Sequence, residues 1–182
     1  VIHLSSPLAS NTATYNTIKN CVVLGNATNT TFAGIVTGGA TGITASLASN
    51  RNNSITNNKI SEVQNGVYLF GPSVVNFDSS NVVTNNKIGD VSDSVGIIGI
   101  YMTMQYGATV SGNEIQNVTP VSNSNVYGIR INESRLCTIS QNKIHKLKYL
   151  QSSSSSVIGI GITATSLNSA TYPASNTIVN NL

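Results

Sequence analysis

The stretch Ile139-Ser140-Gln141-Asn142-Lys143-Ile144 recurs along this 182-residue chain, and its recurrence decides the fold. Copies stand at 55–60 (ITNNKI), 83–88 (VTNNKI) and 110–115 (VSGNEI), with a weaker copy at 18–23 (IKNCVV) and an unfinished one at 178–182 (IVNNL). In the middle of the chain the shared asparagine returns every 27 to 29 residues. A motif with a nearly constant period indicates one small structural unit that is stacked many times.

Composition narrows the class of protein. Hydrophobic residues make up 40% of the chain and charged residues only 8%, which is too apolar for a disordered chain. The net charge of +3 comes from scattered lysines and arginines, so we expect no nucleic-acid partner. No apolar run approaches the roughly 20 residues of a membrane span, so we expect no membrane insertion.

A second element falls once between successive copies of the asparagine motif. It is a glycine followed by alternating apolar residues, which is the period of a strand and not of a helix. We find it at 42–45 (GITA), 66–69 (GVYL), 99–102 (GIYM), 128–131 (GIRI) and 161–164 (GITA). Each repeat then contains three short strands with no partner of their own, which satisfy their backbone groups by stacking on the next repeat.

This combination of strands and turns predicts a parallel β-helix. The pairing of a Gly-Ile-x-Ile strand with an Asn-x-Ile turn resembles the right-handed parallel β-helix proteins, the superfamily that includes pectate lyases and the parallel β-helix repeat proteins of cell surfaces and secretions. The resemblance implies an all-β solenoid of about five to six coils, with three short strands in each coil. We expect a single solenoid segment over 1–182, cut from a longer repeat protein.

Alternation along each strand assigns the core. The side chains that we expect to point inward are Ile43, Val67, Ile100, Ile129 and Ile162 from the first strand, Ile55, Val83, Val110 and Ile139 from the second, and Ile60, Ile88, Ile115 and Ile144 from the third. We expect Val63, Val91, Val118 and Leu147 to close each coil. Two segments, 70–80 and 165–175, are predicted to be loops, and the serine-rich run 151–156 a mobile loop.

The recurring asparagines form a predicted ladder at one bend of the coil. Its members are Asn58, Asn86, Asn113, Asn142 and Asn181, and Cys21 holds the same position in the first copy. Asparagine tolerates a left-handed backbone, and stacked amides hydrogen-bond one another along the axis. Because the residue is the same in every coil, we interpret the ladder as architectural. The other cysteine, Cys137, falls several coils away from Cys21, too far for a disulfide.

Outward positions of the first strand carry the candidate ligand site. They are Thr44, Tyr68, Tyr101, Arg130 and Thr163, in neighbouring coils. Two tyrosines and an arginine on a flat sheet form a platform suited to sugar rings, so Tyr68, Tyr101 and Arg130 are candidate carbohydrate-binding residues. The alternative is that these side chains only stack across strands and stabilise the sheet.

Two carboxylates form the candidate metal site. Glu62 and Asp90 are expected on adjacent coils, with Asn117 and Lys146 in the same column. Carboxylate and amide oxygens are ligands for Ca²⁺, and a lysine beside them can act as a base, an arrangement similar to that of some β-helix polysaccharide lyases. The chain has only six acidic residues, which argues against a metal site; we therefore expect no cofactor, with Ca²⁺ as the one candidate.

Repetition without a singular polar cluster indicates a structural protein. We therefore expect a non-catalytic solenoid module of a secreted or cell-surface protein, acting as a stalk, filament or adhesin-like scaffold. Its expected partners are polysaccharide and neighbouring solenoid segments of the same parent protein. The alternative is a fragment of a β-helix polysaccharide lyase or glycoside hydrolase.

Overall fold

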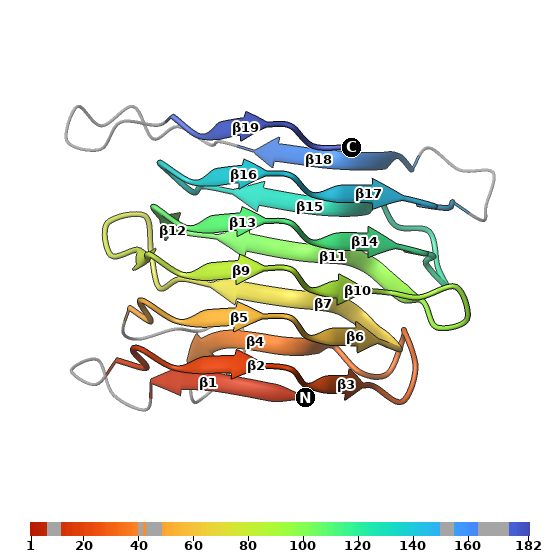
Figure 1. The fold of residues 1–182 in the computed structure, drawn as a ribbon, viewed down its shortest axis with the longest axis horizontal. Helices are drawn as coiled ribbons and strands as arrows, with labels where there is room; N and C mark the ends of the chain where they lie inside the picture. The colour runs from red at the N-terminus through yellow and green to blue at the C-terminus, as the bar shows by residue number, and fades with distance from the viewer. Residues whose placement is uncertain (7–11, 40–41, 43–48, 150–154, 164–174) are drawn as a thin grey trace.

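A computed structural model describes residues 1–6, 12–39, 42, 49–149, 155–163 and 175–182. Every regular element in these ranges is a strand, and the strands stack as a parallel β-solenoid of about five turns (Figure 1). The termini lie at opposite ends of the stack. The predicted all-β solenoid is therefore confirmed. None of the described residues forms a helix long and apolar enough to cross a membrane.

Sheet 1 contains the longest strands. In spatial order they are β1 (Ile2–Ser6), β4 (Ala33–Gly39), β7 (Val63–Phe70), β11 (Val95–Thr103), β15 (Val126–Asn132) and β18 (Val157–Thr163). Each pairs with its neighbour in parallel, one coil above the other.

Sheets 2 and 3 are built from the two halves of the repeated motif. Sheet 2 contains β2 (Thr17–Lys19), β5 (Ser54–Thr56), β9 (Val82–Thr84), β13 (Thr109–Ser111), β16 (Thr138–Ser140) and β19 (Thr177–Val179). Sheet 3 contains β3 (Val22–Leu24), β6 (Lys59–Ser61), β10 (Lys87–Ile88), β14 (Glu114–Gln116) and β17 (Lys143–His145). A short parallel pair, β8 (Asp78–Ser79) with β12 (Gln105–Tyr106), fills one corner.

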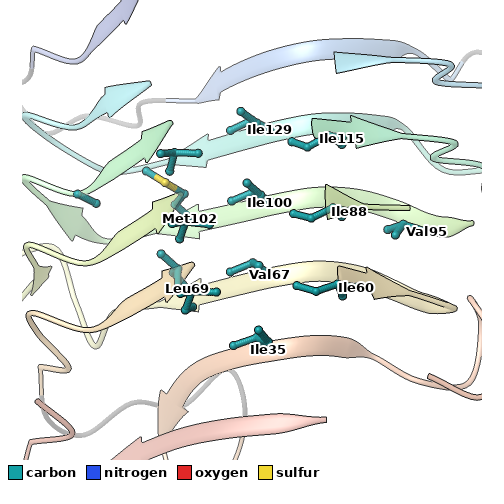
Figure 2. Packing of buried hydrophobic residues seen from close by; sticks show 14 of the residues in the cluster. Ile35, Ile60, Val67, Leu69, Ile88, Val95, Ile100, Met102, Ile115 and Ile129 are labelled. Carbon is teal, nitrogen blue, oxygen red and sulfur yellow. The ribbon is translucent and has the colours of Figure 1, made fainter. Parts of the chain in front are cut away.

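The core consists of aliphatic columns that run along the stack. Figure 2 shows Ile35, Val67, Ile100 and Ile129 one above another, facing the column of Ile60, Ile88 and Ile115. The inward residues of sheet 2 are Ile55, Val83, Val110 and Ile139, which are also buried. Glycine leads the strands of sheet 1 because these columns approach it closely: a Cβ on Gly66 or Gly99 would overlap the isoleucine methyl groups of sheet 3.

The first glycine-led strand was predicted at 42–45, but it lies earlier in the chain, in β4. Ile35 of β4 pairs with Val67, so the glycine that corresponds to Gly66 is Gly34, and Gly42 lies only in an isolated bridge with Gly39. Both segments are a glycine followed by residues typical of a strand, at 34–37 (GIVT) and 42–45 (GITA). The sequence alone therefore does not tell which of the two pairs with the next coil. The predicted core residue Ile43 and the predicted stripe residue Thr44 lie outside the described residues.

The last glycine-led strand is shifted by two residues. Ile129 pairs with Ile160 and Arg130 with Gly161, so the strand is led by Gly159 rather than Gly161. The sequence Gly159-Ile160-Gly161-Ile162 fits the pattern in two registers, and only the pairing with β15 selects one. Thr163 consequently pairs with Asn132 and does not continue the column of Arg130.

The prediction that Val91 closes its coil was also wrong. Val91 is 75% exposed, whereas Val95 is fully buried and pairs with both Val63 and Val118. Residues 90–93 are an insertion at this corner, and the chain rejoins the coil at Ser94, whose carbonyl accepts from the Glu62 N–H. The other closing residues, Val63 and Val118, are buried as predicted, and Leu147 packs against the core.

Candidate functional site

The asparagine ladder is buried and its amides are bonded on every side. In Asn86, the backbone N–H and the side-chain Nδ2 both donate to Asn113 Oδ1, at 2.9 and 3.0 Å. The same Nδ2 donates to the carbonyl of Ile55 at 2.9 Å. This pattern repeats at Asn58, Asn113 and Asn142, and it ends on Asn181, whose Oδ1 accepts from Asn142. The ladder thus supplies the hydrogen bonds of a buried turn.

One detail of the ladder prediction is wrong. The left-handed backbone belongs to the preceding residue of the motif and not to the ladder asparagine itself. These preceding residues have φ between 51° and 65°, and they are Asn20, Asn57, Asn85, Gly112, Gln141 and Asn180. They turn the chain so that the next side chain points into the bend, which explains why the motif so often reads Asn-Asn.

Two further polar rows were missed by the sequence analysis. Five residues before the ladder, a second row contains Asn16, Asn53, Asn81 and Asn176, interrupted by Ala108 and Cys137. Cys137 and Cys21 are both free, and burial raises the pKa of the Cys137 thiol to about 11. Eight residues before the ladder, a third row contains Asn50, Asp78, Gln105 and Ser134, which we call the corner row. A polar residue recurring at both offsets was a signal available in the sequence.

The corner row buries a carboxyl group. Asp78 is fully buried, and its Oδ1 accepts from the Asn50 N–H at 2.7 Å. Its Oδ2 accepts from Gln105 Nε2 at 3.4 Å and from the Thr37 hydroxyl at 3.5 Å. Burial raises the pKa of Asp78 to about 7, although these hydrogen bonds and Arg51 act in the opposite direction. Asp78 lies in the predicted loop 70–80, which instead contains β8.

A shallow depression lies next to this corner. It measures about 320 Å³ and is lined by Arg51, Val75, Asn76, Phe77, Ser79 and Tyr106. The Arg135 guanidinium lies 5.4 Å from the centre of the Phe77 ring. The depression is open to solvent and its wall offers rings and one arginine, with no carboxylate among its lining residues.

The candidate carbohydrate site is a continuous row of rings on the outer face of sheet 1. Pairing in the sheet places Tyr68 beside Tyr101 and Tyr101 beside Arg130, as predicted. The Tyr68 and Tyr101 ring centres are 4.7 Å apart, and Phe32 meets Tyr68 edge-on at 5.0 Å. We call Phe32, Tyr68, Phe70, Tyr101, Tyr127 and Arg130 the aromatic stripe; Phe70 stacks parallel to Tyr68 at 6.2 Å.

Arg130 ends the aromatic stripe as a cation held between two rings. Its Cζ lies 5.6 Å from the Tyr101 ring centre and 5.0 Å from that of Tyr127. Its Nε is buried and has no hydrogen-bond partner. Burial raises the pKa of Tyr68 to about 12, and the neighbouring Tyr101 adds to this effect. The Tyr68 phenol therefore stays protonated and able to donate a hydrogen bond at neutral pH.

The aromatic stripe is shorter than the predicted column. At the two ends, the positions in register with Tyr68 and Arg130 are the buried Val36 and the small Gly161, which lies against the Tyr127 ring. Tyr127 and the two phenylalanines were not predicted, since they precede or follow the repeated column. They lie at different distances from the column, Phe70 two residues after Tyr68, Tyr127 three before Arg130 and Phe32 four before Val36, so no constant spacing marked them in the sequence.

The candidate metal residues Glu62 and Asp90 have different partners. The Asp90 carboxylate lies 2.8 Å from Lys59 Nζ and 3.3 Å from Lys87 Nζ, and these hydrogen bonds lower its pKa. Glu62 Oε1 accepts from the Ser94 N–H at 3.0 Å. Asn117 Nδ2 donates to the Asp90 carbonyl at 2.9 Å, and Lys146 is an exposed corner residue with φ of 55°.

The insertion at residues 90–93 explains this separation, because it moves Asp90 out of the column and puts Ser94 opposite Glu62. Among the described residues, no group of three or more His, Cys, Asp or Glu side chains is placed to hold a metal ion. The Ca²⁺ site stays a prediction that these contacts do not support.

Comparison with known proteins adds no relative. A scan against family models gives no match, and neither curated proteins nor solved structures match the chain. The chain is therefore assigned to the parallel β-solenoids by its fold alone.

Proposed function

We propose that this chain is a non-catalytic structural β-solenoid module of a secreted or cell-surface protein, where it serves as a stalk, filament or adhesin-like scaffold. The proposal includes one ligand, a polysaccharide bound along the aromatic stripe. The observation that carries the ligand is the continuous ring contact through Phe32, Tyr68, Tyr101 and Arg130. Such rings offer apolar faces to sugar C–H groups, while Arg130 and the phenols offer hydrogen bonds.

The scaffold role is supported by the structural features that recur in successive coils. Buried columns of aliphatic residues and hydrogen-bonded asparagines continue through successive coils, so each coil stiffens its neighbours. The low content of charge and cysteine agrees with a Ser-, Thr- and Asn-rich exterior. Neighbouring solenoid segments are the second proposed partner, supported by the exposed apolar side chains Ile162, Ile178 and Val179 on β18 and β19.

The alternative, a fragment of a polysaccharide lyase or glycoside hydrolase, has weaker support. Its acid and base groups would come from Glu62, Asp90 and Lys146. Asp90 is neutralised by two lysines and Glu62 bonds a backbone amide, so neither carboxylate is presented toward a substrate. Incubation with uronate polymers is expected to release no unsaturated products. Release of such products, lost in Arg130→Ala, would overturn the non-catalytic proposal.

Polysaccharide binding is tested by a glycan array followed by titration of the best ligand. Tyr101→Ala removes the central ring, and we expect it to lower affinity about two- to tenfold, the equivalent of the roughly 0.5–1.5 kcal/mol of an aromatic contact. Arg130→Ala is expected to act similarly. Tyr15→Ala is the matched control, because Tyr15 is 79% exposed and precedes β2, away from the stripe. If the wild-type chain binds no glycan, the stripe only stacks across strands.

A further inference from the structure

The outer face of sheet 2 carries a regular pattern that the proposed function does not use. In β5, β9, β13 and β16 the central residue points into the core, and the residues on either side point outward. Pairing in the sheet aligns these outward residues in two rows. One row is Ser54, Val82, Thr109 and Thr138, and the other is Thr56, Thr84, Ser111 and Ser140. We call these eight positions the hydroxyl face.

Seven of these eight residues are serine or threonine, and none is charged. All eight side chains are partly exposed. The Thr56 and Thr84 hydroxyls lie 3.0 Å apart, within hydrogen-bond distance across the strands. On the adjoining strands the first row continues with Thr17 and Thr177, whereas the second row ends at the exposed Lys19 and Val179.

Neutrality distinguishes this face from its neighbour. The outward column of sheet 3 is Lys59, Lys87, Glu114 and Lys143, a fully charged row built on the same coils. The outer face of sheet 1 carries the aromatic stripe. The eight positions of the hydroxyl face carry neither charges nor rings, and the charged Lys19 lies only on the end strand β2, so the partner of this face is uncharged and is not recognised by ring stacking.

Spacing identifies the partner more closely. Neighbouring strands repeat about every 4.8 Å, and residues two apart on one strand lie about 6.6 Å apart. Water molecules joined tetrahedrally at about 2.75 Å repeat at about 4.5 Å within a layer and about 7.3 Å between equivalent layers. The two lattices agree within about 10%, which over four coils is an offset of about 1 Å along the stack. Figure 1 shows β5, β9, β13 and β16 directly above one another with little twist, so the rows stay straight.

We infer that the hydroxyl face binds ice. Its hydroxyls occupy positions where lattice water would otherwise stand, and the threonine methyl groups fill the gaps between them. A charged side chain keeps its own hydration shell and would break this match, which is why the neutrality of the face matters. This inference does not depend on polysaccharide binding, because the aromatic stripe lies on another sheet.

The test is partition of the 182-residue chain into growing polycrystalline ice, together with inhibition of ice recrystallisation. We expect the wild-type chain to be enriched in the ice and to keep the grains small. Thr84→Lys with Thr109→Lys puts two charges in the middle of the face and is expected to abolish both effects. The control is Val121→Lys with Ser122→Lys, which adds the same charge at exposed residues outside the three sheets and should leave ice binding intact.

A third variant keeps the test informative if the double lysine variant fails to fold. Val82→Thr completes the first row and is expected to strengthen recrystallisation inhibition. Exclusion of the wild-type chain from ice would overturn the inference, as would enrichment of the double lysine variant at the wild-type level. Saturable binding of a soluble polysaccharide or self-association, lost in the double lysine variant while the wild type is excluded from ice, would assign the face to that other partner.

Discussion

The asparagine ladder and the corner row have the same geometry and different contents. Both are columns of buried polar side chains at a bend, one residue to a coil. In the ladder every member is an amide, so each Oδ1 accepts from the previous coil while each Nδ2 donates onward. The corner row mixes Asn50, Asp78, Gln105 and Ser134, and its bonds are less regular, with lengths of 2.7, 3.1 and 3.4 Å. Identical residues satisfy one another; mixed residues leave a carboxyl group buried.

The largest expected effect comes from breaking the regular column. Asn113→Leu removes the acceptor of the Asn86 N–H and the donor to the carbonyls of Val83 and Ser111. Two buried backbone groups would lose this partner, while the Ser111 carbonyl still accepts from the Asn85 N–H, so the free energy of unfolding should fall by about 2 to 6 kcal/mol. Urea denaturation measures this change. Asn29→Leu, the same substitution at an exposed turn, is the control and should change little. A loss below about 1 kcal/mol would contradict the role given to the ladder.

A smaller change in the free energy of unfolding is expected when the carboxyl group of the corner row is replaced by an amide. The folded chain keeps a proton on Asp78 up to about pH 7, whereas the unfolded chain releases it near 3.8. The free energy of unfolding therefore falls as pH rises through this window, by up to about 4 kcal/mol, and is level above it. Asp78→Asn mimics the protonated acid, and it should stabilise the chain at pH 8 by about 2 to 4 kcal/mol and little at pH 4.

Denaturation curves at several pH values distinguish this effect from other titrations. The control is Asp93→Asn, which removes the same charge from a residue that is only partly buried. We expect its pH dependence to follow the wild type. Equal stabilisation by Asp78→Asn at pH 4 and pH 8 would show that Asp78 ionises normally in the folded chain.

The smallest effect concerns the left-handed position before the ladder. Gln141 has φ of 56°, where four other coils place asparagine. Asparagine tolerates this conformation better, so Gln141→Asn should stabilise the chain by about 0.5 kcal/mol. Asn85→Gln makes the reverse change two coils away in the same column and should destabilise it similarly. Thermal denaturation measures both, and changes of the same sign in the two variants would contradict this explanation.

Much of the frame was predictable because its signal repeats. The inward residues of sheets 2 and 3 and the ladder asparagines follow the motif coil after coil, so errors in one copy are corrected by the others. Prediction failed where a coil departs from the repeat. Gly42 and Gly161 offered strand patterns as good as those of Gly34 and Gly159. Val91 stood at the expected distance from Ile88, although residues 90–93 are inserted there.

In the candidate sites, too, the residues that follow the repeat were predicted correctly and those that depart from it were not. Tyr68, Tyr101 and Arg130 were aligned correctly from the repeat, whereas Tyr127 and Phe32 join them only because their side chains reach across the sheet. Glu62 and Asp90 were counted into one column, but the insertion sends Asp90 to Lys59 and Lys87. Polysaccharide contact, ice binding and a place at the cell surface stay proposals with the tests given above.

By itself the sequence determined the solenoid, since a repeat of short strands satisfies its backbone groups only by stacking, and the period tells which side chains form the core. The tertiary structure decided the register of the first and last coils, the path of the insertion and the burial of Asp78. These depend on which of several equivalent patterns meets a partner strand, and that competition is settled only when neighbouring coils pack together.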